Sequence, residues 1–164
     1  MHPLVEEAAK KAAVAWLGFG DGPAYCVWVL PLEGRLYVIS GPGEQSVPGL
    51  PEALLTGAPA IVTLRGDHGG SIVAFRAAMI EIRPNSTEWE AVTPQMASKR
   101  LNASGTAEDL VARWAATCVL VALVPEEGEV STELAGRSAA QPPRPGTAVR
   151  ETRKPFRLHR VKKR

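Results

Sequence analysis

The sequence predicts a mainly β, α+β domain in which antiparallel strands close into a small barrel with flanking helices. Short turn signals separate apolar runs of strand length, and such connections join antiparallel neighbours. Two of the runs, residues 25–32 and 117–124, are continuously apolar, so both faces of these strands need cover. A barrel that packs against a second copy of itself supplies that cover. We therefore expect a homodimer.

The first elements are a helix and a hairpin. Residues 3–16 are rich in Ala, Glu and Lys, which favours a helix. The apolar residues 25–32 predict a strand, with Tyr, Val and Trp prominent. The pair Glu33-Gly34 predicts a two-residue hairpin turn, and residues 35–40 form the returning strand.

A glycine-rich loop follows at residues 41–45, where no regular element is expected. Residues 50–56 predict a short helix that ends at Gly57. The next two strands, residues 60–65 and 71–83, flank a tight glycine-rich turn.

Two helices precede the last strand, 117–124. Capping-box patterns open both helices, Thr87-x-x-Glu90 for residues 87–101 and Thr106-x-x-Asp109 for residues 107–116. Pro94 is expected to interrupt or kink the first of them.

Charge divides the chain into a barrel domain, residues 1–136, and a Pro-rich linker with a basic tail, residues 137–164. The first part holds nine Lys and Arg against sixteen Asp and Glu, a formal charge of −7. The second part holds ten against one, a formal charge of +9. We expect the tail to dock on the acidic domain of its own dimer; contact with nucleic acid is the less favoured interpretation.

Several classes of function lack support in the sequence. No apolar stretch is long enough to span a membrane and no secretory signal is evident, so a cytoplasmic protein is expected. Cys26 and Cys118 fall in apolar runs and are interpreted as reduced core residues, and no metal-binding spacing accompanies them. His2, His68 and His159 have no triad partners at suitable spacing, so nucleophilic hydrolysis is not indicated.

Three segments carry a family resemblance: Pro23-Ala-Tyr-Cys-Val-Trp-Val-Leu-Pro31, Gly34-Arg-Leu-Tyr-Val-Ile-Ser-Gly41, and the short helix with the strand after it. Over residues 5–124 the chain resembles the pyridoxamine 5′-phosphate oxidase-like family of FMN-binding split barrels, in particular its flavin/deazaflavin oxidoreductase-like groups of actinobacterial type. The resemblance implies a six-stranded antiparallel split β-barrel and a homodimer. It also implies FMN, or alternatively a deazaflavin, in a groove at the dimer interface. The activity implied is that of an oxidoreductase, whose substrate the sequence does not identify.

The resemblance also implies where the cofactor binds. Its phosphate is expected in the loop after residue 40 and on the following strands, and helix cations add charge. Trp28 is expected either to stack on the flavin ring or to be a core or interface residue. The buried-strand arginines either contact the cofactor or form ion pairs. The candidate residues are Trp28, Ser40, Gly41, Gly43, Gln45, Arg65, Arg76, Lys99 and Arg100.

One residue departs from the family pattern. The loop carries Glu44, and no Lys or Arg lies between Arg35 and Arg65, where the family places a phosphate-binding cation. An unpaired carboxylate would repel a phosphate. Either Lys99 and Arg100 supply the missing charge, or the chain has lost or changed its cofactor. The alternative function is therefore a non-catalytic split barrel without flavin, whose basic tail contacts a partner or nucleic acid.

Overall fold

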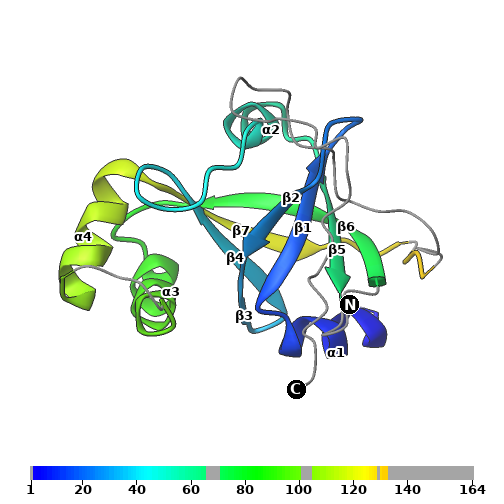
Figure 1. The fold of residues 1–164 in the computed structure, drawn as a ribbon, viewed down its shortest axis with the longest axis horizontal. Coiled ribbons are helices and arrows are strands. Elements are labelled where there is room, and N and C mark those ends of the chain that lie inside the picture. Colours follow the sequence, from blue (N-terminus) through cyan, green and yellow to red (C-terminus); the bar gives the residue numbers. More distant parts are fainter. Residues whose placement is uncertain (1, 66–70, 101–104, 129, 133–164) are drawn as a thin grey trace, which may run out of the picture.

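The computed structural model describes residues 2–65, 71–100, 105–128 and 130–132. Its sheet contains seven antiparallel strands in the order β2-β1-β5-β6-β7-β4-β3. Four helices flank the sheet, with α1 and α2 at opposite ends of the barrel and α3 and α4 side by side (Figure 1). The strands are β1 (Val14–Phe19), β2 (Tyr25–Trp28), β3 (Leu30–Leu32), β4 (Arg35–Ser40), β5 (Ala60–Arg65), β6 (Ser71–Ile82) and β7 (Val119–Pro125). The helices are α1 (Pro3–Lys11), α2 (Leu50–Thr56), α3 (Thr87–Ser98) and α4 (Ala107–Thr117).

The barrel closes through a bend at Val29. The sequence predicts one strand over residues 25–32, and the structure divides it into β2 and β3. β2 pairs with β1, whereas β3 pairs with β4 at the other end of the strand order. One continuous segment therefore connects the two edges of the sheet, and the barrel is nearly closed. The predicted split-barrel fold is confirmed, and β2 with β3 counts as one of its six strands.

The helix expected over residues 3–16 is wrong in its second half. α1 ends at Lys11, and Val14–Phe19 forms β1. Burial alternates along the start of this strand: Ala15 and Leu17 are fully buried, while Val14 is 46% exposed. This period of two is that of a half-buried strand. The Ala-rich composition hid it, because alanine favours a helix wherever tertiary pairing does not decide.

Helix ends follow local signals more closely. The capping box of Thr106 and Asp109 is confirmed at α4. The other predicted box is wrong by one residue, because Ser86 caps α3 by accepting a hydrogen bond from the Trp89 N–H. α3 continues through Pro94 and ends at Ser98. The short helix α2 and the turn at residues 33–34 are confirmed, and Glu33 and Gly34 both have positive φ, as a type I′ turn requires.

The sheet has a hydrophobic core on each of its two sides. The first fills the barrel and includes Val5 of α1 and Leu50 of α2. The second lies between α3, α4 and the outer side of β4 and β7, and includes Trp89 and Trp114. These two helices cover only part of the outer side of the sheet.

The uncovered part of the outer side lies over β1, β5 and β6, and we call it the open face. Its exposed apolar side chains are Val14, Ile61 and Ile80, which are 46%, 40% and 45% exposed. Directly paired residues share a face of a sheet, so the pairing of Ile61 with Arg76 places that arginine on the open face too.

The cysteines differ from expectation. Cys26 is exposed and Cys118 is only partly buried, so Cys26 is not a core residue. Cys26 pairs with Trp16 across β2 and β1, with its side chain on the outer side of the edge strand. Both thiols are free.

No helix in the described part of the chain is long and apolar enough to cross a membrane. The predicted linker and basic tail, residues 137–164, lie outside the described residues.

Candidate functional site

The loop between β4 and α2 begins with a tight turn. The Glu44 N–H donates to the Gly41 carbonyl oxygen at 3.0 Å, and the Gly41 N–H donates to the Gln45 carbonyl oxygen at 3.2 Å. Pro42 and Gly43 occupy the middle of this turn, and Gly43 has a φ of 78°. This is the arrangement of a type II turn, which needs glycine at its third position. The N–H groups of Gly41 and Glu44 are thereby engaged within the loop.

Gly41 packs directly on the junction between α4 and β7. A Cβ at this position would lie 2.7 Å from the Cys118 sulfur and 2.9 Å from the Thr117 carbonyl oxygen. Only glycine fits here without displacing the backbone. The predicted glycine loop thus serves close packing as well as turn geometry.

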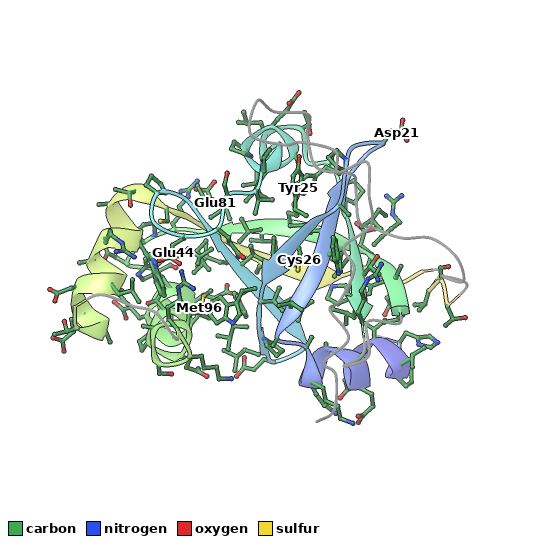
Figure 2. All side chains as sticks on the ribbon, in the orientation of Figure 1. Asp21, Tyr25, Cys26, Glu44, Glu81 and Met96 are labelled. Carbon is green, nitrogen blue, oxygen red and sulfur yellow. The ribbon has the colours of Figure 1, made fainter. Side chains whose placement is uncertain are left out.

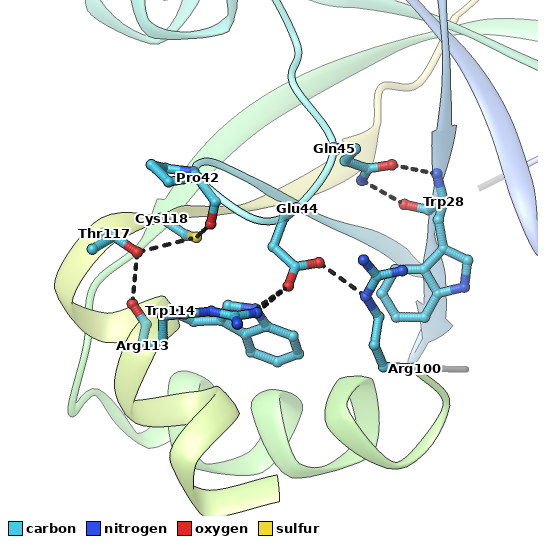
Figure 3. A network of polar contacts seen from close by, with 9 residues as sticks. All are labelled: Trp28, Pro42, Glu44, Gln45, Arg100, Arg113, Trp114, Thr117 and Cys118. Atoms are coloured by element: carbon cyan, nitrogen blue, oxygen red, sulfur yellow. Dashed lines mark hydrogen bonds and ion pairs between the residues drawn. The ribbon is translucent and has the colours of Figure 1, made fainter. Parts of the chain in front are cut away.

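Gln45 fixes the other end of the loop to β2. Its side-chain oxygen accepts a hydrogen bond from the Trp28 N–H at 2.6 Å, and its NH₂ group donates to the Trp28 carbonyl oxygen at 2.9 Å. Both ends of the amide are therefore used by the backbone of the neighbouring strand (Figure 3).

Glu44 lies at the centre of a cluster that joins the loop to α3 and α4 (Figure 3). Its carboxylate accepts from Arg100 Nε at 2.9 Å, from Arg113 Nη2 at 2.8 Å and from Trp114 Nε1 at 3.0 Å. The Glu44 side chain is only 3% exposed, whereas those of Arg100 and Arg113 are 30% and 40% exposed. The Glu44 carboxylate is therefore paired with two guanidinium groups: that of Arg100, one of the two helix cations considered for this loop, and that of Arg113 in α4.

A pocket of about 280 Å³ lies beside this cluster. Four of the nine candidate residues line it together: Trp28, Gly43, Gln45 and Arg100. Ile39 and Glu44 complete the lining. Figure 2 shows Glu44 on the side of α3 and α4, away from Asp21 at the tip of the β1–β2 turn.

The other candidate residues lie outside the pocket lining. Ser40 begins the same loop and accepts a hydrogen bond from the Val47 N–H at 3.2 Å. Gly41 lies in the turn described above. Lys99 is exposed at the end of α3.

The two strand arginines lie on the outer side of the sheet. The Arg65 guanidinium lies over the Trp16 ring, 5.1 Å from its centroid. Arg76 forms an ion pair with Glu126 at 3.2 Å and is largely exposed, which agrees with the ion-pair alternative. Neither arginine lines the pocket beside Glu44.

Sequence reasoning missed Arg113 and Trp114. Both lie in α4, far from the loop in the chain, and Arg113 and Glu44 are 69 positions apart. The absence of a cation between Arg35 and Arg65 signalled that the charge must come from elsewhere. Nothing in the sequence pattern pointed to α4 as the source.

A second polar cluster links β4 to the first turn of α3. Glu88 accepts hydrogen bonds from the Tyr37 hydroxyl and from Arg35 Nη1, both at 2.7 Å. Burial and the Glu88 carboxylate raise the pKa of Tyr37 to about 12. The Tyr37 hydroxyl therefore keeps its proton as a donor, and the cluster anchors the helix pair to the sheet.

Comparison with solved structures places this fold among split-barrel proteins. The chain matches a protein assigned as a pyridoxamine 5′-phosphate oxidase from Listeria innocua, with 15% identity over 77% of this chain and 93% of that one, at a TM-score of 0.53. The heme storage protein HutZ from Vibrio cholerae matches with 12% identity over 80% and 93%, at 0.56. An FAD- and heme-binding protein from Mycobacterium smegmatis matches with 17% identity over 79% and 69%, at 0.51.

No protein-family model matches the chain, and neither does any curated protein sequence. At these identities the structural matches establish the fold. They confirm the resemblance to pyridoxamine 5′-phosphate oxidase-like split barrels.

Proposed function

We propose that this chain binds a flavin, FMN in the first place, and acts as an oxidoreductase in a homodimer. The observation that carries the proposal is the pocket beside Glu44. The family resemblance nominated Trp28, Gly43, Gln45 and Arg100 for a flavin site, and they line one pocket. An aromatic side chain for stacking and a guanidinium for a phosphate are the groups that a flavin needs.

The residues of the pocket fit part of a flavin. Its volume of about 280 Å³ is just below the range of roughly 300–1,000 Å³ for ligand pockets. A site completed by a second copy would remove this shortfall. Trp28 shares the outer side of the sheet with Val14, its partner across β2 and β1, so the pocket borders the open face.

The open face supports the homodimer. Val14, Ile61 and Ile80 expose apolar side chains on β1, β5 and β6. Burial of these side chains by a partner would remove apolar surface from water. The partner proposed for this face is a second copy of the chain, which would bury Arg65 and Arg76 at the interface.

A bound flavin would supply the hydride-transfer chemistry, and the protein would supply binding and orientation. Arg100 would hold an anionic group of the cofactor, and Trp28 would present its ring to the flavin. Gln45 keeps the Trp28 backbone in place through two hydrogen bonds. A deazaflavin would make the same demands on these residues and is the alternative cofactor.

The second candidate is a non-catalytic split barrel that binds no flavin. One observation favours it: the N–H groups of Gly41 and Glu44 donate within the loop, so they do not form a free backbone cradle for a phosphate. Under this proposal the basic residues 137–164 would mediate contact with a partner. Steep loss of nucleic-acid binding with salt, and its abolition on deletion of the tail, would favour a nucleic acid as that partner.

An absorbance spectrum of the purified full-length protein tests the main proposal, before and after titration with FMN and with a deazaflavin. We expect a flavin band that co-elutes with a dimer, or saturable binding of one of the two. Absence of binding by a folded protein would reject the flavin proposal in favour of the second candidate.

A further inference from the structure

We propose that Arg100 and Arg113 form an anion subsite that binds a phosphate group, and that Glu44 is the positioning residue that holds both guanidinium groups at the loop. The subsite itself does not depend on the proposed function. Identification of the phosphate as that of a flavin does rest on it.

The first argument is charge. Two guanidinium groups share one carboxylate, so the cluster has a formal charge of +1. Among the described residues, Glu44 is the only carboxylate that lines the adjacent pocket, and its side chain is only 3% exposed. Arg100 lines the pocket together with Glu44, and Arg113 lies next to it beside Gly43, so the net positive charge of the cluster adjoins the pocket.

The second argument is the supply of donors. Each guanidinium carries five N–H groups in a planar fork. In the contacts of the described residues, Arg100 binds Glu44 through Nε and Arg113 binds it through Nη2. Terminal N–H groups of both arginines remain for a ligand. Guanidinium groups bind phosphate well because they donate parallel, charge-assisted hydrogen bonds.

The third argument is the close approach of Arg113 to the loop. A Cβ at Gly43 would lie 3.6 Å from Arg113 Cζ, so the guanidinium packs against the bare backbone there. The N–H groups of Gly41, Glu44 and Val47 are engaged within the loop and are therefore not donors to an anion. The arginines supply charged donors in their place.

Glu44 positions these arginines rather than repelling the ligand. It is the acceptor that orders two long and partly exposed side chains, and Trp114 Nε1 fixes the same carboxylate from the core. Without the carboxylate, the arginines are free to turn toward solvent. Removal of the Glu44 charge is thus expected to weaken anion binding. If Glu44 simply repelled the anion, its removal would strengthen binding instead.

The test compares FMN, riboflavin, which lacks the phosphate, and inorganic phosphate as ligands of the full-length protein. The variants are Glu44→Gln, Arg100→Gln and Arg113→Gln. Matched controls are Glu90→Gln on the exposed side of α3 and Arg83→Gln after β6, both at exposed positions. Flavin affinity is measured by fluorescence quenching, phosphate affinity by phosphorus NMR, and folding by circular dichroism.

We expect wild-type protein to bind FMN about tenfold to a hundredfold more tightly than riboflavin, the range for hydrogen bonds to a charged group. The ratio should fall toward one in Glu44→Gln, Arg100→Gln and Arg113→Gln, with riboflavin affinity unchanged. It should stay at the wild-type value in both controls. If Glu44→Gln does not fold, Glu44→Asp replaces it, and we expect an intermediate ratio because the charge is kept and the reach is shortened.

The outcomes separate the two proposals. Equal affinity of the wild type for FMN and riboflavin overturns the subsite and leaves flavin binding intact. Tighter FMN binding by Glu44→Gln overturns the positioning role. If neither flavin binds but inorganic phosphate binds the wild type and not Arg113→Gln, the subsite stands and the flavin proposal fails.

Discussion

The side-chain amide of Gln45 pairs with the backbone of Trp28 in the way a neighbouring strand would. It accepts from the Trp28 N–H at 2.6 Å and donates to the Trp28 carbonyl oxygen at 2.9 Å. Trp28 ends β2, directly before the bend at Val29 that carries the chain across the barrel. The loop after β4 thus satisfies backbone groups at the point where the sheet is split.

Gln45→Ala should destabilise the protein by about 1–3 kcal/mol, because it leaves two partly buried backbone groups without their partner. The loss of stability should be confined to the end of β2. We expect the Trp28 amide to exchange its hydrogen much faster in the variant, as measured by NMR-detected hydrogen exchange.

Gln95→Ala is the matched control, because the Gln95 amide is exposed and, among the described residues, bonds only to the Ala91 carbonyl oxygen within α3. This variant should leave the hydrogen-exchange rate of the Trp28 backbone amide unchanged. Equal protection of Trp28 in Gln45→Ala and wild type would contradict the bridging role.

Gly41→Ala should be strongly destabilising. The added Cβ would meet the Cys118 sulfur at 2.7 Å, the Cys118 Cα at 2.8 Å and the Thr117 carbonyl oxygen at 2.9 Å. Two of these atoms are backbone, so rotation of a side chain does not relieve the contact. Overpacking of this kind costs about 1–3 kcal/mol or more. Chemical denaturation measures it.

Gly128→Ala serves as the comparison, because a Cβ there meets no atom within 4 Å. Its unfolding free energy should stay within about 0.5 kcal/mol of the wild type. A Gly41→Ala variant as stable as Gly128→Ala would show that the loop can move away from β7.

Local sequence signals predicted the elements that local chemistry decides. The turn at Glu33-Gly34 and the helix that ends at Gly57 follow from backbone preferences of the residues themselves. β1 was missed, because the pairing of its Trp16 with Thr63 depends on a strand far away in the chain. Intrinsic helix and strand propensities predict the structure of such a segment only when no tertiary contact overrides them.

The same limit applies to the site. Trp28, Gly43, Gln45 and Arg100 could be nominated because family resemblance fixed the loop and its neighbours, and they line one pocket. The role of Glu44 could not be predicted. Arg100 was one of two cations considered for this loop, whereas nothing in the sequence pointed to Arg113 of α4.

Alkaline pH should reveal the contact of Tyr37 with Glu88. The pKa of Tyr37 rises from 10.0 to about 12 in the folded protein. The unfolded chain therefore binds fewer protons than the folded one between these values, so stability falls as the pH increases through this window. The contribution of Tyr37 should be complete below pH 10 and lost above about pH 12.

Tyr37→Phe isolates this effect, because other alkaline groups titrate equally in both proteins. The difference in unfolding free energy between wild type and variant should be constant below pH 10 and shrink toward pH 12. Urea denaturation at a series of pH values measures it. Parallel curves across the whole window would show that the Tyr37 pKa is not raised.

Ile61→Asp should dissociate the proposed homodimer without unfolding the barrel. Ile61 is 40% exposed on the open face, so the monomer tolerates a charge there. In a dimer that buries this face, an unpaired carboxylate carries a large desolvation cost. Analytical ultracentrifugation should find wild-type protein as a dimer and Ile61→Asp as a monomer, with unchanged circular dichroism.

Leu55→Asp is the control, because Leu55 is 88% exposed on α2, away from the open face. It introduces the same charge in place of an equally apolar side chain and should leave the mass unchanged. If flavin binding needs the second copy, Ile61→Asp should also weaken FMN binding, whereas Leu55→Asp should not. A wild-type monomer, or a dimer that survives Ile61→Asp, would mean that the open face is not the dimer interface.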